Sequence, residues 1–403
     1  MNFPPRTFET PVLQRGSVSV LRRVDLAREP HWRRAFANER KDHRYYELVE
    51  DTIHQGFDYR YFAVRDGAKD IQAIAPFFLL DQDLLAGIPA PLQALAAAIR
   101  RVFPRFLILR TLMVGCAAGE GHLDGAVGER TDHARTLAES ILAHARMLSA
   151  KLIVLKEFRA ADRKALVCFC ERGFTRAPSF PMTALNIDYA SFEDYMERAL
   201  SRKTRRDLRL KFRAAASAAP IEMSVLTDIS AIIDDIYPLY LQVFSRSRHK
   251  FEKLTKAYFR ELGQRMPDKV RFFIWRQNGR PIALSICMLH GDSIYAEYLG
   301  LDYAVALDLH LYHYAFRDIV RWAIPRGFKW FRSGGLNYQP KYHLRVRLDP
   351  LDLYVRHCND VINAVLRRVL PLVEPTRYDP VLKKFPDFAT LHGAPPPVVA
   401  PKR

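Results

Sequence analysis

The sequence predicts an α/β protein with mixed sheets, arranged as two similar domains side by side. The first observation behind this prediction is size and composition. The chain has 403 residues, of which 49% are hydrophobic and 26% charged, as in a globular protein of two to three domains. The second observation is a repeat, because one order of strands and helices occurs twice along the chain. Two such mixed units leave a cleft between them, where ligands often bind.

The first copy opens with a strand at 17–25 and a helix at 29–39 that has Pro30 near its first turn. Two β-rich runs then flank Asp66-Gly67, which predicts a hairpin. The remaining elements are an apolar helix at 89–103, a strand at 106–115, an amphipathic helix at 132–149 and a strand at 151–158. We expect a first domain over residues 17–185.

The second copy repeats this order without the extra apolar helix. It starts with a strand at 221–226, and a hairpin is predicted around Asn278-Gly279. The other elements are helices at 234–244 and 255–265, a strand at 293–300, a helix at 309–324 and a strand at 329–333. We expect a second domain over residues 220–375, followed by a Pro-rich, disordered tail at 390–403.

A basic helical linker, residues 186–219, joins the two domains. Ser191 followed by Asp194 is a helix-capping pattern. One face of the helix carries residues spaced four apart, which are Leu200, Thr204, Leu208 and Phe212. The other faces carry seven cations, which are Arg202, Lys203, Arg205, Arg206, Arg209, Lys211 and Arg213.

The whole chain is basic, with 62 Lys and Arg against 44 Asp and Glu and a net charge of +18. Such a surplus suits nucleic acid, an anionic membrane or a phosphate-bearing substrate, although a solvated surface would explain it too. The five cysteines form no C-x-x-C pattern, which argues against disulfides and a zinc site. Residues 1–12 do not resemble a signal peptide, and no apolar run is long enough to span a bilayer. We expect a reduced, cytoplasmic protein, and the sequence leaves open a peripheral contact with the inner membrane.

Three stretches of the chain together resemble a known family. They are the basic run 191–213, the run of hairpin, strand, helix and strand at 271–333, and the segment 334–357, where Gly, Tyr and Lys follow a strand. Over about residues 17–375 the chain resembles the FemAB-like N-acyltransferases of the GNAT superfamily, in particular the CelD-like or BioF-associated branch. The resemblance implies two tandem GNAT-like domains that move an acyl group from acyl-CoA or aminoacyl-tRNA to an amine.

The sequence departs from simple acetyltransferases in the loop that holds the CoA pyrophosphate through backbone N–H groups. Their Q/R-x-x-G-x-G/A pattern is replaced at 300–310 by GLDYAVALDLH, which has no glycine pair. The first copy reads GCAAGEGH at 115–122, with glycines but no preceding Arg or Gln. Members of the FemAB-like group commonly lack this loop, so the resemblance leaves the donor open.

Glu297 is the first candidate catalytic residue, because acylation of an amine needs a base and GNAT enzymes often carry one on this strand. Strand alternation places Tyr295, Glu297 and Leu299 on one face, so Tyr295 is a candidate substrate-binding residue. The alternative is a solvent-facing or salt-bridged glutamate on the strand.

The segment 341–348 alternates strictly, which predicts a strand that emerges at the mouth of the cleft. Four cations or potential cations would then share one face, which are Lys341, His343, Arg345 and Arg347. Such a face suits a phosphate or carboxylate, but an exposed antiparallel face alternates in the same way. We predict Tyr338 and Lys341 as further catalytic residues that stabilise oxyanion charge. The predicted donor- and substrate-binding residues are Arg332, Gly334, Gly335, His343, Arg345 and Tyr295.

His310 and His313 lie one helical turn apart, but no acidic partner has metal spacing with them, and we predict no metal site. We expect no permanently bound cofactor, acyl-CoA as co-substrate, and a small-molecule or cell-envelope amine as acceptor. One alternative is an aminoacyl-tRNA donor held by the basic helix. Another is a non-enzymatic protein that binds nucleic acid or anionic membrane. No protein partner is evident from the sequence.

Overall fold

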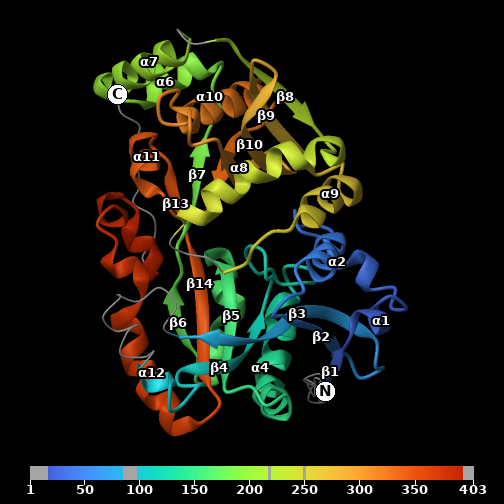
Figure 1. The fold of residues 1–403 in the computed structure, drawn as a ribbon. Helices are drawn as coiled ribbons and strands as arrows, with labels where there is room; N and C mark the ends of the chain where they lie inside the picture. The colour runs from blue at the N-terminus through green and yellow to red at the C-terminus, as the bar shows by residue number, and fades with distance from the viewer. Residues whose placement is uncertain (1–16, 85–97, 217–218, 248–250, 394–403) are drawn as a thin grey trace, which may run out of the picture.

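The computed structural model describes residues 17–84, 98–216, 219–247 and 251–393, and these form two seven-stranded mixed sheets with helices packed against them (Figure 1). The first sheet has the order β1-β2-β3-β4-β5-β14-β6. Its strands are β1 (Ser17–Leu21), β2 (Asp58–Arg65), β3 (Ile71–Asp83), β4 (Ile108–Val114), β5 (Leu152–Arg159), β14 (Leu351–His357) and β6 (Thr175–Pro178).

The second sheet repeats this arrangement in the order β8-β9-β10-β11-β12-β7-β13. Its strands are β8 (Ile221–Leu226), β9 (Val270–Gln277), β10 (Arg280–His290), β11 (Ser293–Leu301), β12 (Trp330–Ser333), β7 (Met182–Asn186) and β13 (Arg347–Asp349). In each sheet four antiparallel strands lead into one parallel pair, which is β4 with β5 and β11 with β12.

The two units exchange one strand each, which the sequence pattern did not predict. β7 pairs with β12 and β13 in the second sheet, and β14 pairs with β5 and β6 in the first. Each exchanged strand therefore fills an interior place in the sheet of the other unit. The predicted domain boundaries stay a prediction. No single position along the described chain separates the strands of the first sheet from those of the second.

The helices of the first unit are α1 (Arg23–Leu26), α2 (His43–Thr52), α4 (Arg130–Met147) and α5 (Arg163–Glu171). Those of the second are α8 (Ile233–Arg246), α9 (Lys256–Arg265), α10 (Leu311–Ala323) and α11 (Tyr338–His343), whereas α12 (Asp360–Val373) packs against β14 and β6 of the first sheet. α2 and α9 pack together between the two sheets, and one hydrophobic cluster runs through both units there (Figure 1). The hydroxyls of Tyr45 and Tyr258 hydrogen-bond across this junction at 2.8 Å.

The predicted basic helix is two helices, α6 (Phe192–Ala199) and α7 (Arg202–Ala216). The Ser191 side chain accepts a hydrogen bond from the Asp194 backbone N–H, so the predicted cap is confirmed. Leu208 is buried on α7, as its spacing predicted. The helix is interrupted at Leu200. The Ser201 side chain then caps the start of α7 by accepting a hydrogen bond from the Thr204 backbone N–H.

Most other predicted elements are present, but two are wrong. The predicted helix at 29–39 is reduced to the 3-10 turn η1 (Trp32–Arg34), and the predicted strand at 341–348 is the helix α11 followed by the short β13. Residues 89–97 of the predicted apolar helix lie outside the described residues. The same holds for 394–403 of the predicted tail, whereas residues up to 392 form η7 (Phe388–His392), where Leu391 is buried.

None of the helices in the described ranges is long and apolar enough to cross a membrane.

Candidate active site

In the second sheet the parallel strands β11 and β12 separate at their carboxyl ends, and we call this opening the fork. Pairing of β11 with β12 stops at Ala296 and Ser333, and Glu297 is an extra residue in the register between β10 and β11. This bulge moves Tyr298 to the face of Tyr295 and Leu299 to the face of Ala296. The predicted alternation is therefore wrong beyond Glu297, although Tyr295 and Glu297 do share a contact with Arg40.

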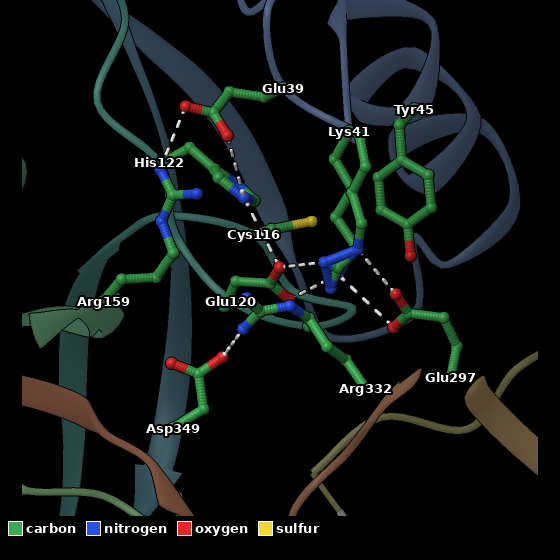
Figure 2. Close-up of polar contacts among 12 residues, drawn as sticks. Glu39, Lys41, Tyr45, Cys116, Glu120, His122, Arg159, Glu297, Arg332 and Asp349 are labelled. Carbon is green, nitrogen blue, oxygen red and sulfur yellow. Dashed lines mark hydrogen bonds and ion pairs between the residues drawn. The ribbon is translucent and has the colours of Figure 1, made fainter. Parts of the chain in front are cut away.

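Glu297 belongs to a buried ionic cluster that joins the two units (Figure 2). Arg40 Nε donates to Glu297 Oε1 at 2.8 Å, and another of its nitrogens donates to Glu120. Lys41 Nζ lies 2.8 Å from Glu120 Oε2 and 3.7 Å from Glu297 Oε2. The Arg40 and Lys41 side chains are 3% and 0% exposed, so their charges depend on these two carboxylates. Glu297 is therefore a salt-bridged glutamate, and its role as a catalytic base stays a prediction.

The cluster continues into the first unit through a second set of ion pairs. Glu39 Oε1 accepts from Arg130 at 3.1 Å and from Arg159 at 2.9 Å. His122 Nε2 lies 3.4 Å from Glu120 Oε1 and 3.9 Å from Glu39 Oε2, which links the two sets (Figure 2).

Opposite charges, rather than solvent, determine the protonation states in this cluster. Burial works to raise the pKa of Glu120, but the charges of Arg40 and Lys41 outweigh it and hold that pKa well below its usual value. Burial likewise works to lower the pKa of Arg40, and Glu120 and Glu297 reverse the effect. Burial lowers the pKa of His122, and this effect outweighs the nearby carboxylates of Glu120 and Glu39, which act to raise it.

The glycine-rich loop that follows β4 is folded around cations. The Ala118 carbonyl accepts from Lys41 Nζ and from the Tyr45 hydroxyl, and the Gly119 carbonyl accepts from Lys156 Nζ. Gly119 has φ +99°, and a Cβ there would lie 1.9 Å from Lys41 Nζ, so only glycine fits. A loop that presents carbonyls and Glu120 to lysines does not suit a pyrophosphate.

The corresponding loop before α10 satisfies its own backbone. The N–H groups of Ala306 and Leu309 donate to the carbonyls of Asp302 and Val305. The N–H of Tyr303 donates to the Gln242 side chain. These donors are therefore not free to bind phosphate oxygens.

Donor groups without a partner remain at the fork. The Arg40 guanidinium stacks over the Tyr295 ring at 4.2 Å, and that of Arg332 lies 5.7 Å from the same ring. Arg332 also pairs with Asp349 of β13 (Figure 2). Arg40 Nη2 and Arg332 Nε are buried and have no hydrogen-bond partner among the described residues. An anionic group beside Tyr295 would satisfy both.

Lys341 does not lie at the mouth of a strand, as predicted, but on α11. Its side chain is buried, and Nζ donates to the Gly334 carbonyl. Gly334 borders the fork, since its N–H donates to the Ala296 carbonyl at 3.3 Å. Burial lowers the pKa of Lys341 to about 7, so the amine is close to half neutral at physiological pH.

The other predicted residues of this segment do not share a face with Lys341. His343 and Arg345 are exposed. Tyr338 is buried and donates to the Pro181 carbonyl at 2.8 Å, which gives its hydroxyl a packing role; its catalytic role stays a prediction. Gly335 lies against Tyr338 and the backbone of 180–181, which leaves no room for a side chain.

The buried residues explain why the alternation was misleading. Tyr338, Lys341 and Leu344 are buried at a helical spacing of three, whereas Leu344, Val346 and Leu348 are buried at a strand spacing of two. Pro340 is compatible with the first turn of α11 because a helix leaves its first N–H groups unpaired.

Sequence reasoning missed the N-terminal half of the site. Glu39, Arg40 and Lys41 stand in a run of charges that reads as a solvated loop, and only Glu120 has a local signal, the glycines around it. Lys269 of the second unit holds this run in place, through the Glu39 carbonyl at 2.9 Å and the Asp42 carboxylate at 2.7 Å.

Comparison with known proteins gives a family and a fold. The FemAB-like family model, described as peptidoglycan biosynthesis/recognition, matches residues 123–341. The chain belongs to the FemAB-like family. No curated protein matches the chain.

Similar solved structures include FemX, with a TM-score of 0.50, 11% identity and coverage of 80% of this chain and 93% of FemX. L-PGS from Bacillus licheniformis has a TM-score of 0.48 and 10% identity, over 81% of this chain and 94% of its own. A tandem GNAT protein from the clavulanic acid biosynthesis pathway has a TM-score of 0.43 and 12% identity, over 77% of this chain and 86% of its own. The likeness to FemX extends to the fold of this FemAB-like chain, which is two similar mixed α/β units, and the family supports a transferase of acyl groups.

The ionic cluster of the FemAB-like chain can be tested through Glu120. Glu120→Gln leaves Arg40 and Lys41 with one carboxylate instead of two, so we expect the free energy of unfolding in urea to fall by about 3–5 kcal/mol. The control Glu197→Gln, at an exposed site on α6, should change it by less than about 0.5 kcal/mol. Equal stability of both variants would mean that the cluster is hydrated rather than buried.

Lys341 predicts a pH dependence of stability. Its pKa is about 7 in the folded protein and returns to the ordinary lysine value of 10.5 on unfolding, so the unfolded state binds more protons between these values. Wild-type stability should therefore gain a contribution as pH rises from about 7 to 10. Lys341→Met should lack that contribution. Between pH 7 and pH 10 the free energy of unfolding of the wild type should therefore rise relative to that of the variant, by about a few kcal/mol. Parallel stability curves for the two proteins would show an ordinary lysine pKa.

Proposed function

We propose that this FemAB-like chain transfers an aminoacyl group from aminoacyl-tRNA to an amine of a peptidoglycan precursor. Family membership supports the acceptor class, because the family description is peptidoglycan biosynthesis/recognition. We choose aminoacyl-tRNA over acyl-CoA as the donor because of the hydrogen bonds in the two loops that precede α4 and α10. One is folded around lysines and the other has its N–H groups occupied, so a CoA pyrophosphate has no counterpart in either.

The surface of α7 supports a polyanionic donor. An open depression there is lined by Glu197 and five cations, which are Arg202, Lys203, Arg205, Arg206 and Arg209. Arg202, Lys203, Arg206 and Arg209 are exposed, and Leu208 anchors the helix from the opposite side. A row of exposed cations on a rigid helix suits contacts with an RNA backbone.

The fork of the second sheet supports the chemistry. The acceptor ammonium loses a proton, its nitrogen attacks the ester carbon, and the C–O bond to the tRNA ribose breaks as that oxygen takes up a proton. Lys341, with a pKa of about 7, can accept and return this proton. Arg40 and Arg332, with unpaired N–H groups beside Tyr295, can hold an anionic part of the precursor or oxyanion charge.

Glu297 is the second candidate for the proton acceptor. Its two oxygens already face Arg40 and Lys41, so accepting a proton would disturb both ion pairs. We therefore assign it first to positioning Arg40 at the fork.

The two candidates can be separated by their kinetics. Lys341→Met should lower kcat by about 10²–10⁴-fold and remove a pH-rate transition near 7, because it deletes the acid–base group. Glu297→Gln should lower kcat less and keep that transition. Tyr342→Phe, on the same helix, serves as control and should remain near wild-type. A larger loss for Glu297→Gln, with the transition abolished, would make Glu297 the base.

The donor can be tested directly with labelled aminoacyl-tRNA in a transfer and filter-binding assay. Reversal of Arg202, Arg206 and Arg209 to Glu should weaken tRNA binding at least about tenfold, because phosphate contacts dominate such affinity. The matched control reverses the exposed Arg28, Arg33 and Arg34 of the first unit and should bind normally.

Acyl-CoA forms the other arm of the same experiment. A true CoA donor at about 100 times its dissociation constant would stabilise the protein by about 2.7 kcal/mol, which a thermal shift detects. Stabilisation by acyl-CoA without transfer from tRNA would establish the CoA donor. Binding of tRNA with no transfer to any amine would contradict the enzymatic proposal.

A further inference from the structure

α12 is an apolar helix that only partly packs against the protein. Its sequence, DVINAVLRRVLPLV, has four polar residues among fourteen. Asn363 is buried, and Leu366 and Leu370 pack against the hydrophobic cluster that both units share. These three residues lie on one side of the helix, so most of its remaining surface is free of contact with the described chain.

The outer side of α12 exposes six aliphatic side chains. They are Val361 (76%), Ile362 (52%), Val365 (58%), Val369 (43%), Leu372 (58%) and Val373 (58%). At 100° per residue, all six fall within one arc of about 120°. Monomeric soluble proteins seldom leave such a continuous apolar surface without a partner.

A second exposed apolar segment lies at the same end of the first sheet. Val102 and Phe103 are 73% and 66% exposed, a few residues before β4 begins at Ile108. The sheet register aligns Thr111 of β4 with Leu152 of β5, and Leu152 with His357, three residues before α12. In Figure 1 both segments lie at the lower end of the molecule.

The charges beside this surface are positive. Arg368 borders the apolar arc on α12, and Arg101 is exposed beside Val102. Within the described part of the chain these two form no ion pair, whereas the nearby Asp360 is paired with Arg356 at 2.9 Å. Long arginine side chains at the border of an apolar face can reach anionic headgroups while the apolar side chains enter the lipid.

We propose that α12, with the segment around Val102 and Phe103, docks this protein onto the surface of an anionic lipid bilayer. A helix of 14 residues is about 21 Å long, too short to cross a hydrocarbon core of roughly 30 Å, so it lies in the plane of the interface. This surface contains no residue assigned to the donor or acceptor, and the inference is independent of the proposed reaction.

Charge favours lipid over a second copy of the chain as the partner. A two-fold dimer would bring the same patch of each copy together, and hence Arg368 and Arg101 of one copy close to those of the other, while the neighbouring Asp360 is already paired with Arg356. An anionic bilayer turns the same arginines into attractive contacts.

Vesicle sedimentation tests the proposal with phosphatidylcholine vesicles, with or without phosphatidylglycerol. The wild-type protein should bind the anionic vesicles, and added salt should weaken binding. V365D/L372D should lower the partition coefficient at least tenfold, and R101Q/R368Q about twentyfold on anionic vesicles only. Val127→Asp, at an 81% exposed site elsewhere, is the matched control and should bind as wild type.

Three results would overturn the proposal. One is absence of wild-type binding, and another is equal binding by V365D/L372D. The third is a wild-type dimer in sedimentation velocity that V365D/L372D dissociates without any loss of vesicle binding, which would assign α12 to a second copy. The α7 reversal R202E/R206E/R209E should keep most vesicle binding while losing tRNA, so failure of the donor proposal and failure of this one are distinguishable.

Discussion

Burial of Arg40 and Lys41 is the constraint on which the centre of this molecule depends. Two cations without access to water need carboxylates, and Glu120 comes from the first unit while Glu297 comes from the second. The same pairs therefore hold the two halves in register and fix the bulge of β11 at the fork. The loop around Ala118 and Gly119 adds carbonyl oxygens, so its shape follows from the ammonium groups that it encloses.

This arrangement bears on the chemistry of the site. Of the two loops that precede α4 and α10, one encloses lysine ammonium groups and the other has its backbone N–H groups occupied within the protein. What remains at the fork is a pair of arginines with unpaired N–H groups, and Lys341 with a pKa near neutrality. Such a site has the groups needed to bind an anion and to move a proton.

Strand exchange adds a second connection between the units. Because β7 and β14 each complete the other unit's sheet, relative motion of the units would break interior backbone ladders. The fork, the ionic cluster and the α2–α9 junction are thus parts of one rigid centre, and the exposed surfaces of α7 and α12 lie outside it.

The sequence by itself determined the local elements and the repeat. Turn chemistry at Asp66-Gly67 and Asn278-Gly279, the Ser191 cap and the spacing of Leu208 are decided by neighbours along the chain, and they were predicted correctly. Glu297 was proposed because the resemblance places a base on its strand, Tyr295 because alternation puts it on the same face, and Arg332 because it stands next to the paired glycines Gly334 and Gly335. Only the tertiary structure decided the exchange of β7 and β14, since pairing depends on distant partners. It also decided that Arg40 and Lys41 are buried, because their counterions come from residues far apart in sequence. Lys341 shows the same limit: alternation cannot separate a strand from a short helix when the burial of each residue depends on what packs above it.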